Sequence, residues 1–388
     1  MKIGIDARWI FKEMSGIGVY TRELIRHLAQ IDRQNEYVIF FCDQYLMAAI
    51  AEELLLSQAA NFKAVLVNFG LFSLKNQFNM PRVIAEQNLD IFHATNYMIP
   101  LRAFPRGHSG RTACVTTIHD LIPLMFPAAT PRSRKKRFFP IYRWLMNETA
   151  KRSRVIITVS NSSRHDIIRH LPCPADRVLV IPEGVRPHFK PLDANPAALT
   201  EARFKRKTKR IFWVGRQDPY KNLLALIEAF ALLRKRYDGS LELRLAGPAD
   251  SRYPEPLLRA QTIGVTDSVK WLGHITDSQL VSEYQNANLF VMPSLYEGFG
   301  LPALEAMACG TPVVCSNRAS LPEICGAAAM QINPEDTPGL CNAMRRVLTD
   351  TNYATGLAER GLIQAAKYTW METAKRTILA YEKALQNE

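Results

Sequence analysis

Apolar residues in this chain gather in short runs, and these runs alternate with segments in which apolar positions recur every three or four residues. Short apolar runs bounded by polar or turn residues indicate buried strands, whereas the wider spacing indicates amphipathic helices. In the first half we predict a helix at 18–31 and strands at 2–7, 36–42, 90–95, 114–120 and 153–160. This alternation is typical of a parallel sheet covered by helices.

The segment 182–196 interrupts the pattern, since it holds four prolines and shows no periodicity. We interpret it as the link between two domains. The alternation then restarts, with a helix expected at 222–237 and strands at 210–215, 241–247, 269–273, 288–294 and 311–316. A chain of 388 residues is long enough for two domains that each bury a core. The predicted fold class is α/β, with two Rossmann-like doubly wound parallel sheets whose ligands bind beyond the carboxyl ends of the strands.

The composition is that of an ordinary soluble globular protein, with 47% apolar and 22% charged residues. No stretch approaches the roughly 20 apolar residues that span a bilayer. Asp6 and Arg8 stand where a signal peptide would need an apolar run, so we expect a cytoplasmic protein. The seven cysteines are scattered without a Cys-x-x-Cys pair, which favours buried thiols over disulfides or a metal site.

Positive charge is concentrated in the first half. Residues 1–190 hold 26 Lys and Arg against 15 Asp and Glu, a balance of +11, and the remainder holds 23 against 21. One basic cluster, 131–154, interleaves its charges with aromatic residues, and a second occupies 203–210. The first cluster suits peripheral contact with an anionic membrane. Nucleic acid is an alternative partner, and a helix with an aromatic core face and a solvated basic face is the plain structural reading.

The segment from Tyr296 to Val314 carries the strongest motif, in which a Gly-x-Gly turn opens a short helix between two carboxylates, Glu297 and Glu305. Backbone N–H groups at Phe299, Gly300 and Leu301 would favour an anion at the helix start. A carboxylate in the first turns of a helix also suits the helix dipole, but that does not explain Glu297 in the preceding loop. Because carboxylates accept hydrogen bonds from vicinal hydroxyls, the motif suits a nucleotide-sugar.

Two cations follow the predicted strand at 210–215. Arg216 and Lys221 lie in the loop that enters the next helix, where they would form a clamp for a diphosphate. Taken alone they are better explained as solvated loop charges. The downstream carboxylate motif in the same domain favours the clamp.

His119 follows a buried strand of the first domain, at the end where the ligand is expected. A lone histidine is more often a packed or surface residue than a catalytic one, so its predicted position carries the argument. Asp120 would either orient His119 or cap the following turn.

Gly16 and Gly18 precede the first helix and partly match the dinucleotide fingerprint. Thr21 stands where the third glycine of that fingerprint belongs. A nicotinamide cofactor, whose ribose Asp43 would bind, is therefore the weaker interpretation. A glycine loop that approaches a phosphate or the acceptor fits better. The chain contains no Asp-x-Asp, Walker loop, Gly-x-Ser-x-Gly or His-Glu-x-x-His sequence. A carboxylate-held divalent metal is therefore not indicated.

These features together resemble the large family of retaining glycosyltransferases with the GT-B fold, which includes bacterial mannosyltransferases of surface-polysaccharide and glycolipid assembly. The resemblance rests on "GRQDPYKN" at 215–222, on the Glu-x7-Glu block in "EGFGLPALEAMACGTPVV", on the His119-Asp120 pair and on the glycine loop. It implies domains at 1–186 and 187–369, which face each other across a cleft, and a last helix at 370–388 that crosses back onto the first domain.

The resemblance also implies roles for the residues of the second domain. Arg216 and Lys221 would bind the donor diphosphate and stabilise the leaving group. Glu305 would hold the ribose hydroxyls and Glu297 the hydroxyls of the transferred sugar, with the backbone at Phe299–Leu301 near the phosphate.

In the first domain, the same resemblance places His119 on the sugar, at its 6-hydroxyl, and Gly16 near the diphosphate. The family's glycine loop often has adjacent glycines, whereas this chain has Ser15-Gly16 in that place. Attack from the leaving-group face, with the donor phosphate accepting the proton, is the family's usual hypothesis for retention. Domain closure would bring His119 and Arg216 onto one donor.

The implied activity is metal-independent transfer of a hexose, mannose from GDP-mannose in the first instance, onto a glycan or lipid-linked acceptor. UDP- and dTDP-sugars such as glucose and rhamnose donors remain alternatives, as does a nucleotide-sugar 2-epimerase of the same fold. A nucleic-acid binder would use the net charge of +13 but leaves Glu297 and Glu305 unexplained.

Overall fold

The computed structural model describes residues 1–11, 16–126 and 139–386. The chain forms two compact units, with Met1–Leu121, Phe138–Gly184 and Thr369–Glu388 in unit 1 and Ile122–Arg137 and Val185–Tyr368 in unit 2. The crossing between them falls after Gly184, two residues before the predicted boundary. Ile122 and the residues that follow it group with unit 2, where the Phe126 ring packs edge-on against that of Tyr296 at 5.6 Å.

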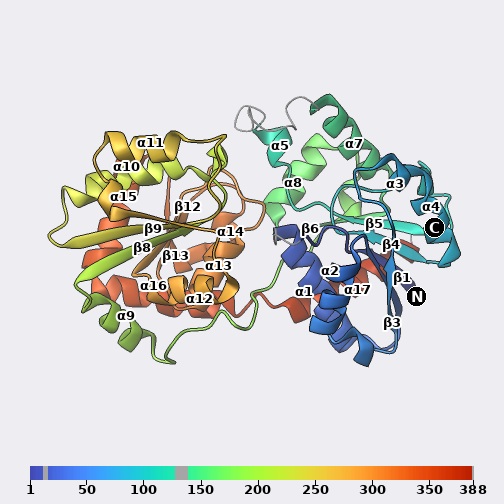
Figure 1. Cartoon of the computed structure of the whole chain (residues 1–388), viewed down its shortest axis with the longest axis horizontal. Coiled ribbons are helices and arrows are strands. Elements are labelled where there is room, and N and C mark those ends of the chain that lie inside the picture. Colours follow the sequence, from blue (N-terminus) through green and yellow to red (C-terminus); the bar gives the residue numbers. More distant parts are fainter. Residues whose placement is uncertain (12–15, 127–138, 387–388) are drawn as a thin grey trace. The chain divides into compact units, whose positions relative to one another are not determined.

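Unit 1 is built on a parallel sheet in the order β3-β2-β1-β4-β5-β6-β7 (Figure 1). Its strands are β1 (Lys2–Asp6), β2 (Glu36–Phe41), β3 (Phe62–Leu66), β4 (Ile91–Ala94), β5 (Ala113–Thr117), β6 (Val155–Thr158) and β7 (Val178–Val180). Its helices are α1 (Gly16–Ile31), α2 (Gln44–Glu53), α3 (Leu74–Phe78), α4 (Met80–Glu86), α7 (Phe139–Arg152), α8 (Asn161–His170) and α17 (Trp370–Gln386). The reversal of strand order at β1 makes it a doubly wound sheet.

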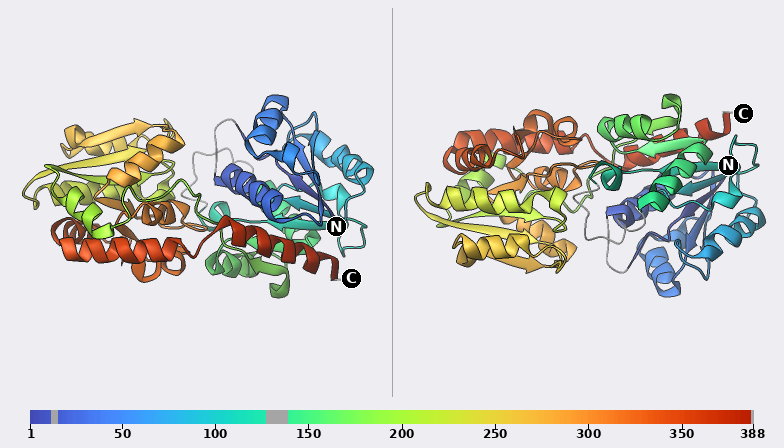
Figure 2. Two further views of the ribbon diagram at one scale, coloured as in Figure 1. Left: turned by 90° about the horizontal axis from the view of Figure 1, so that it is seen from below. Right: turned by 90° about the horizontal axis from the view of Figure 1, so that it is seen from above.

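The two faces of this sheet are covered by different helices, because successive strand residues point to opposite sides. Ile39 packs with Leu24 of α1 and Tyr381 of α17, whereas its neighbours Val38 and Phe40 pack with residues of α4. Helix α17 therefore completes the core of unit 1, where it lies beside α1 (Figure 2). The buried Tyr381 hydroxyl also hydrogen-bonds the ring of His93 at 2.8 Å.

Unit 2 has a second parallel sheet in the order β10-β9-β8-β11-β12-β13. Its strands are β8 (Thr208–Val214), β9 (Ser240–Ala246), β10 (Val269–Gly273), β11 (Leu289–Met292), β12 (Val313–Ser316) and β13 (Ala329–Ile332). Its helices are α5 (Ile122–Met125), α9 (Pro196–Phe204), α10 (Leu223–Arg234), α11 (Glu255–Thr262), α12 (Asp277–Asn286), α13 (Leu301–Ala308), α14 (Leu321–Cys325), α15 (Thr337–Thr349) and α16 (Thr351–Ala365). The strand order again reverses at an internal strand, β8, so both units have the predicted Rossmann-like architecture.

Aromatic packing on one face of this second sheet positions a residue of the later argument. The ring of Tyr284, on α12, packs edge-on against Phe212 of β8 at 5.2 Å and against Phe290 of β11 at 5.3 Å. Helices α10 and α15 pack on the opposite face, since their apolar residues cluster with Ile211 and Val291. Tyr284 is thereby fixed between the sheet and α13.

Two chemical expectations can be compared with this fold. Five of the seven cysteines are buried, while Cys42, just after β2, is exposed and Cys173 is half-buried. Within the described ranges, no helix combines the length and the apolar character needed to cross a membrane.

Candidate active site

In unit 2, the loop after β8 and the loop after β11 meet through an ion pair. The Lys221 ammonium donates to both carboxylate oxygens of Glu297, at 2.8 and 2.9 Å. Both side chains are largely buried, with 15% and 9% of their surface exposed. The sequence assigned these two residues separately, to diphosphate and to sugar hydroxyls, and the structure brings them together.

The backbone around Glu297 is held by hydrogen bonds from other loops. The Ser320 hydroxyl lies 2.9 Å from the Glu297 carbonyl oxygen and 2.7 Å from that of Phe299. Leu295 N–H donates to the carbonyl of Tyr220 at 2.7 Å, which joins this loop to the one that carries Lys221. The Gly-x-Gly turn and its carboxylate are therefore rigid parts of the unit.

Gly300 caps the start of α13 with a φ of 108°, a conformation that favours glycine. A Cβ there would also lie 2.7 Å from a methyl group of Leu321. The first N–H groups of the helix that begins at Leu301 precede its internal hydrogen bonds, so they are suited to an anion. The backbone predicted to bind phosphate thus lies at the start of this helix.

Glu305 lies on α13 and is almost fully buried, with 5% of its surface exposed. The Tyr284 hydroxyl donates to one carboxylate oxygen at 3.1 Å, and the guanidinium of Arg186 lies 3.5 Å from the other. Burial raises the pKa of Glu305 to about 7, against the opposing effect of Arg186. Sequence reasoning missed both partners, because Tyr284 lies within an ordinary helix and Arg186 within the segment interpreted as a linker.

Arg216 differs from Lys221 in its exposure. Its side chain is 63% exposed, and its Nε lies 3.1 Å from a carboxylate oxygen of Asp218. Arg216 follows directly on Gly215, whose carbonyl oxygen would lie 1.9 Å from a Cβ at Gly247. The exposed guanidinium of Arg216 is therefore accessible to a ligand.

In unit 1, His119 lies beyond the carboxyl end of β5, as predicted. Its Nδ1 is 3.2 Å from a carboxylate oxygen of Glu183, and its Nε2 is 3.1 Å from the carbonyl oxygen of Thr95. The ring of Tyr20 packs edge-on against the imidazole at 4.7 Å. Glu183 thus contacts His119, a partner that the sequence analysis did not predict.

Gly16 begins α1 and is exposed, while residue 15 of the glycine loop lies outside the described residues. Among the described atoms, none lies within 4 Å of a Cβ placed at Gly16. Packing therefore gives no account of this glycine, and its predicted role beside a phosphate is untested.

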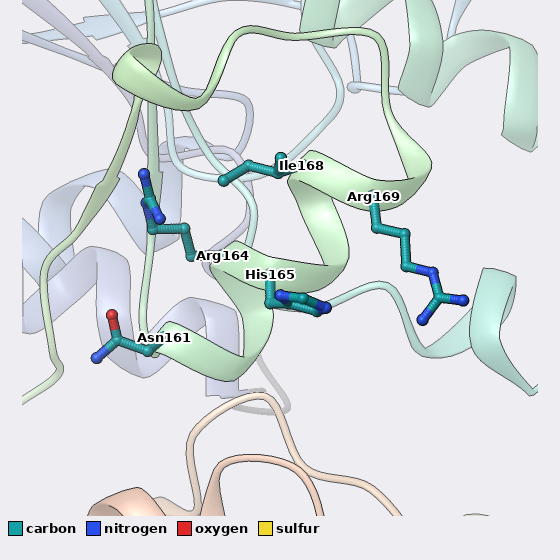
Figure 3. Close-up of a pocket in the computed structure, with 5 residues that line it drawn as sticks. All are labelled: Asn161, Arg164, His165, Ile168 and Arg169. Atoms are coloured by element: carbon teal, nitrogen blue, oxygen red, sulfur yellow. The ribbon is translucent and has the colours of Figure 1, made fainter.

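A cavity of about 440 Å³ lies along α8, which begins beyond the carboxyl end of β6. It is lined by Asn161, Arg164, His165, Ile168 and Arg169 (Figure 3). The side chains of Arg164 and Arg169 extend to opposite sides of the helix (Figure 3), and Arg164 donates to two backbone carbonyls. These charges do not converge on one point. None of the predicted site residues lines this cavity, although Ser163 of the same helix donates to the His119 carbonyl at 2.9 Å.

Two protein families match this sequence. The family described as Glycosyltransferase Family 4 matches residues 14–189, and that described as Glycosyl transferases group 1 matches residues 208–350. O-antigen chain mannosyltransferase B of Escherichia coli is 30% identical over 98% of this chain and 100% of its own length. The serotype-specific mannosyltransferase WbdA of Escherichia coli is 34% identical over 76% of this chain. The matched region makes up only 36% of the length of WbdA.

Solved structures show the same fold at lower identity. Sucrose-phosphate synthase from Thermosynechococcus elongatus superimposes with a TM-score of 0.75 at 20% identity, over the full length of both chains. HepE from Anabaena, solved in complex with UDP and glucose, gives 0.73 at 18% identity over 98% of this chain and 99% of its own. With the two doubly wound units, these similarities identify the GT-B fold.

Proposed function

Because the chain belongs to the glycosyltransferases of family 4, the group 1 glycosyl transferases, we propose that it transfers mannose from GDP-mannose with retention of configuration. The acceptor is a glycan or a lipid-linked glycan of surface-polysaccharide synthesis. The observation that carries this proposal is the Lys221–Glu297 pair beside the Gly300 turn, in a chain similar over its whole length to an O-antigen mannosyltransferase.

Transfer breaks the bond between the sugar C1 and the diphosphate oxygen, which leaves with the electron pair. Lys221, Arg216 and the first N–H groups of α13 stabilise the negative charge that grows on that oxygen, and such electrostatic stabilisation is usually the largest catalytic term. No metal ion is required in this scheme, since the two side-chain cations take its place.

The acceptor hydroxyl oxygen forms the new bond to C1, and its proton passes to the departing diphosphate. Glu297 binds hydroxyls of the transferred sugar when the diphosphate draws Lys221 away from it. Glu305 accepts hydrogen bonds from the ribose hydroxyls, and His119 contacts the sugar. Gly16 allows the backbone to approach the diphosphate.

The donor is tested by incubating the protein with GDP-mannose, UDP-glucose and dTDP-rhamnose in turn, with a lipid-linked glycan acceptor and with EDTA. We expect GDP-mannose to be consumed without added metal, and proton NMR to show an α-linked product. Consumption of UDP-glucose or dTDP-rhamnose instead would identify the alternative donors. Epimerisation of the nucleotide-sugar without any acceptor would indicate the epimerase.

A lipid-linked acceptor requires that the protein reach a membrane, and α7 carries the features for peripheral contact at the inner face of the cytoplasmic membrane. Ile141 and Trp144 are 60% and 53% exposed, and Arg143 between them is also exposed. Exposed aromatic and apolar side chains among basic residues suit an anionic bilayer surface. Part of the basic cluster, 131–138, lies outside the described residues.

Sedimentation with liposomes tests this contact. We expect liposomes with anionic lipid to retain the wild-type protein at low salt, and Trp144→Ser to reduce the retention. Leu379→Ser is the control, since Leu379 is similarly exposed at 61% on another helix of unit 1. Equal retention of all three proteins, or none on any liposome, would contradict the membrane contact.

A further inference from the structure

The segment Glu183–Arg186, through which the chain passes from unit 1 to unit 2, carries charged side chains that a simple connection does not need. Glu183 is 8% exposed and Arg186 is 5% exposed. Charged residues of connecting segments usually lie in solvent, and their burial requires specific partners. Both partners are residues already assigned to the active site.

The backbone of this segment is fixed by the chain that returns at 368–373. A Cβ at Gly184 would lie 2.1 Å from the backbone nitrogen of Trp370. The Thr373 hydroxyl donates to the Pro182 carbonyl at 2.7 Å, and Val185 N–H donates to the Tyr368 carbonyl at 3.0 Å. With its backbone fixed in this way, the segment holds the side chains on either side of Gly184 in defined positions.

On the unit 1 side, Glu183 contacts His119. The two imidazole nitrogens face two acceptors, the Glu183 carboxylate at 3.2 Å and the Thr95 carbonyl at 3.1 Å. Two such contacts hold the imidazole ring in one orientation.

On the unit 2 side, Arg186 contacts two carboxylates. One guanidinium nitrogen lies 3.5 Å from Glu305, and another forms an ion pair with Asp277 at the start of α12. The guanidinium also lies over the ring of Phe189, at 4.9 Å from its centroid. Arg186 is thus held in place beside the carboxylate that is proposed to bind ribose.

We propose that Glu183 and Arg186 are positioning residues of the active site, Glu183 for His119 and Arg186 for Glu305. Through His119, Glu183 acts on sugar transfer. Through Glu305, Arg186 acts on recognition of the nucleotide's ribose. These roles rest on the proposed function. They predict that a change at Glu183 affects turnover and that a change at Arg186 affects nucleotide binding, although the two residues are only three positions apart.

The chemistry around Glu305 explains why Arg186 is needed. The other titratable groups that face this carboxyl are Tyr284, Asp277 and Cys309, none of which supplies positive charge. Without the guanidinium, burial and the negative charge of Asp277 would favour the neutral acid. A neutral carboxyl group has fewer acceptor sites for two vicinal hydroxyls than a carboxylate has.

The experiment compares binding of GDP and of 2′,3′-dideoxy-GDP by calorimetry. For the wild type we expect GDP to bind more tightly, because only GDP has the ribose hydroxyls. Arg186→Gln should weaken GDP binding about tenfold and leave dideoxy-GDP unchanged, so that the discrimination disappears, and Arg186→Lys should restore part of it. Lys190→Gln, a change at an exposed cation four residues after Arg186, is the control.

Glu183→Gln is measured in the same series. It should lower kcat with the mannose donor about tenfold while the Kd for GDP stays at the wild-type value. Melting temperatures show whether each variant is folded. Equal weakening of GDP and dideoxy-GDP by Arg186→Gln, or an unchanged kcat in Glu183→Gln, would overturn the inference and give the segment a purely structural role.

Failure of the proposed function would look different. If the wild type binds none of GDP, UDP, ADP and dTDP, the proposed function itself is overturned, and the ribose role of Arg186 with it. If the wild type prefers another of these diphosphates, the experiment is repeated with the ribo and dideoxy forms of that nucleotide in place of GDP and dideoxy-GDP. Nucleotide binding with ribose discrimination that persists in Arg186→Gln overturns this inference alone.

Discussion

The two units present their functional side chains in different ways. In unit 2, two carboxylates of one loop and helix are each matched by a cation, Glu297 by Lys221 and Glu305 by Arg186. In unit 1, one imidazole, that of His119, lies between acceptors from two separate segments. Unit 2 thus balances buried charges before any ligand arrives, whereas unit 1 orients a single group. Changes in unit 2 should alter nucleotide binding and stability as well as turnover, whereas changes in unit 1 should alter turnover alone.

Among the single substitutions considered, Lys221→Met should cause the largest loss of activity. It removes a cation from the leaving group and leaves the buried Glu297 carboxylate without its ion pair. We expect kcat/KM for GDP-mannose to fall about 100- to 1000-fold, with a lower melting temperature. Steady-state kinetics and calorimetry measure both. Lys205→Met, which removes an exposed ion pair with Glu201, is the control and should change neither.

Adding Glu297→Gln to Lys221→Met separates the two losses. The double variant should regain melting temperature, because no unpaired carboxylate remains buried, but it should stay inactive. Recovery of activity would argue against the assignment of Lys221 to the leaving group.

His119→Gln tests the opposite side of the comparison. The amide keeps some hydrogen bonding but cannot carry positive charge, so we expect kcat to fall about 100-fold. The Kd for GDP should not change, because the nucleotide is assigned to unit 2. Parallel kinetic and calorimetric measurements decide this, and a matching loss of GDP affinity would mean that the two units do not divide their roles in this way.

Arg216→Ala should have a smaller effect than Lys221→Met, since its side chain is 63% exposed and its charge is already screened by solvent. We expect GDP to bind about tenfold more weakly and its stabilisation of the protein against heat to shrink. Arg259→Ala, which removes an exposed arginine paired with Glu228, serves as the control. The idea of a diphosphate clamp fails if the two variants behave alike in a thermal-shift titration with GDP.

The smallest expected effect is a pH-dependent change in stability. Burial raises the pKa of Glu305 to about 7, so the folded protein holds this proton more tightly than the unfolded chain does. Glu305 therefore lowers stability as the pH rises from about 4.5 to about 7. Glu305→Gln removes the cost of the buried charge but also its ion pair with Arg186. We expect it to be about 1 kcal/mol more stable than the wild type at pH 8, and equally stable at pH 5.

Chemical denaturation at both pH values measures this difference. The same variant should bind GDP more weakly at pH 8. Together the two results would show that the Glu305 carboxylate of the wild type strengthens GDP binding and lowers the stability of the fold. A variant that is less stable than the wild type at pH 8 would mean that the ion pair outweighs the cost of burial.

The strands that the sequence did not predict lie at the edges of the two sheets. β3 and β7 flank the sheet of unit 1, and β13 flanks that of unit 2. Central strands are buried on both faces and form continuous apolar runs, whereas an edge strand is partly exposed. β3 shows this directly, since none of its residues is fully buried. A hydrophobic pattern therefore reveals central strands more clearly than edge strands.

The candidate site divides in a similar way. The Gly-x-Gly turn with Glu297 and Glu305 was predictable because a strand end, a turn and a helix start are encoded within 20 residues. The partners Glu183, Arg186 and Tyr284 were not, because each meets its functional residue through packing of segments that are distant in sequence. Local patterns thus locate the candidate groups, and packing within each unit determines which residues contact them.

The position of α17 in unit 1 has a consequence for how the protein is made. The core around β5 and β6 includes Trp370, Ala374, Ala380 and Tyr381, which are synthesised after the whole of unit 2. Unit 2 lies entirely between Ile122 and Tyr368, so its sheet can form while the chain is still being extended. Unit 1 is therefore begun before unit 2 but completed after it, and until α17 is made its sheet lacks one covering helix.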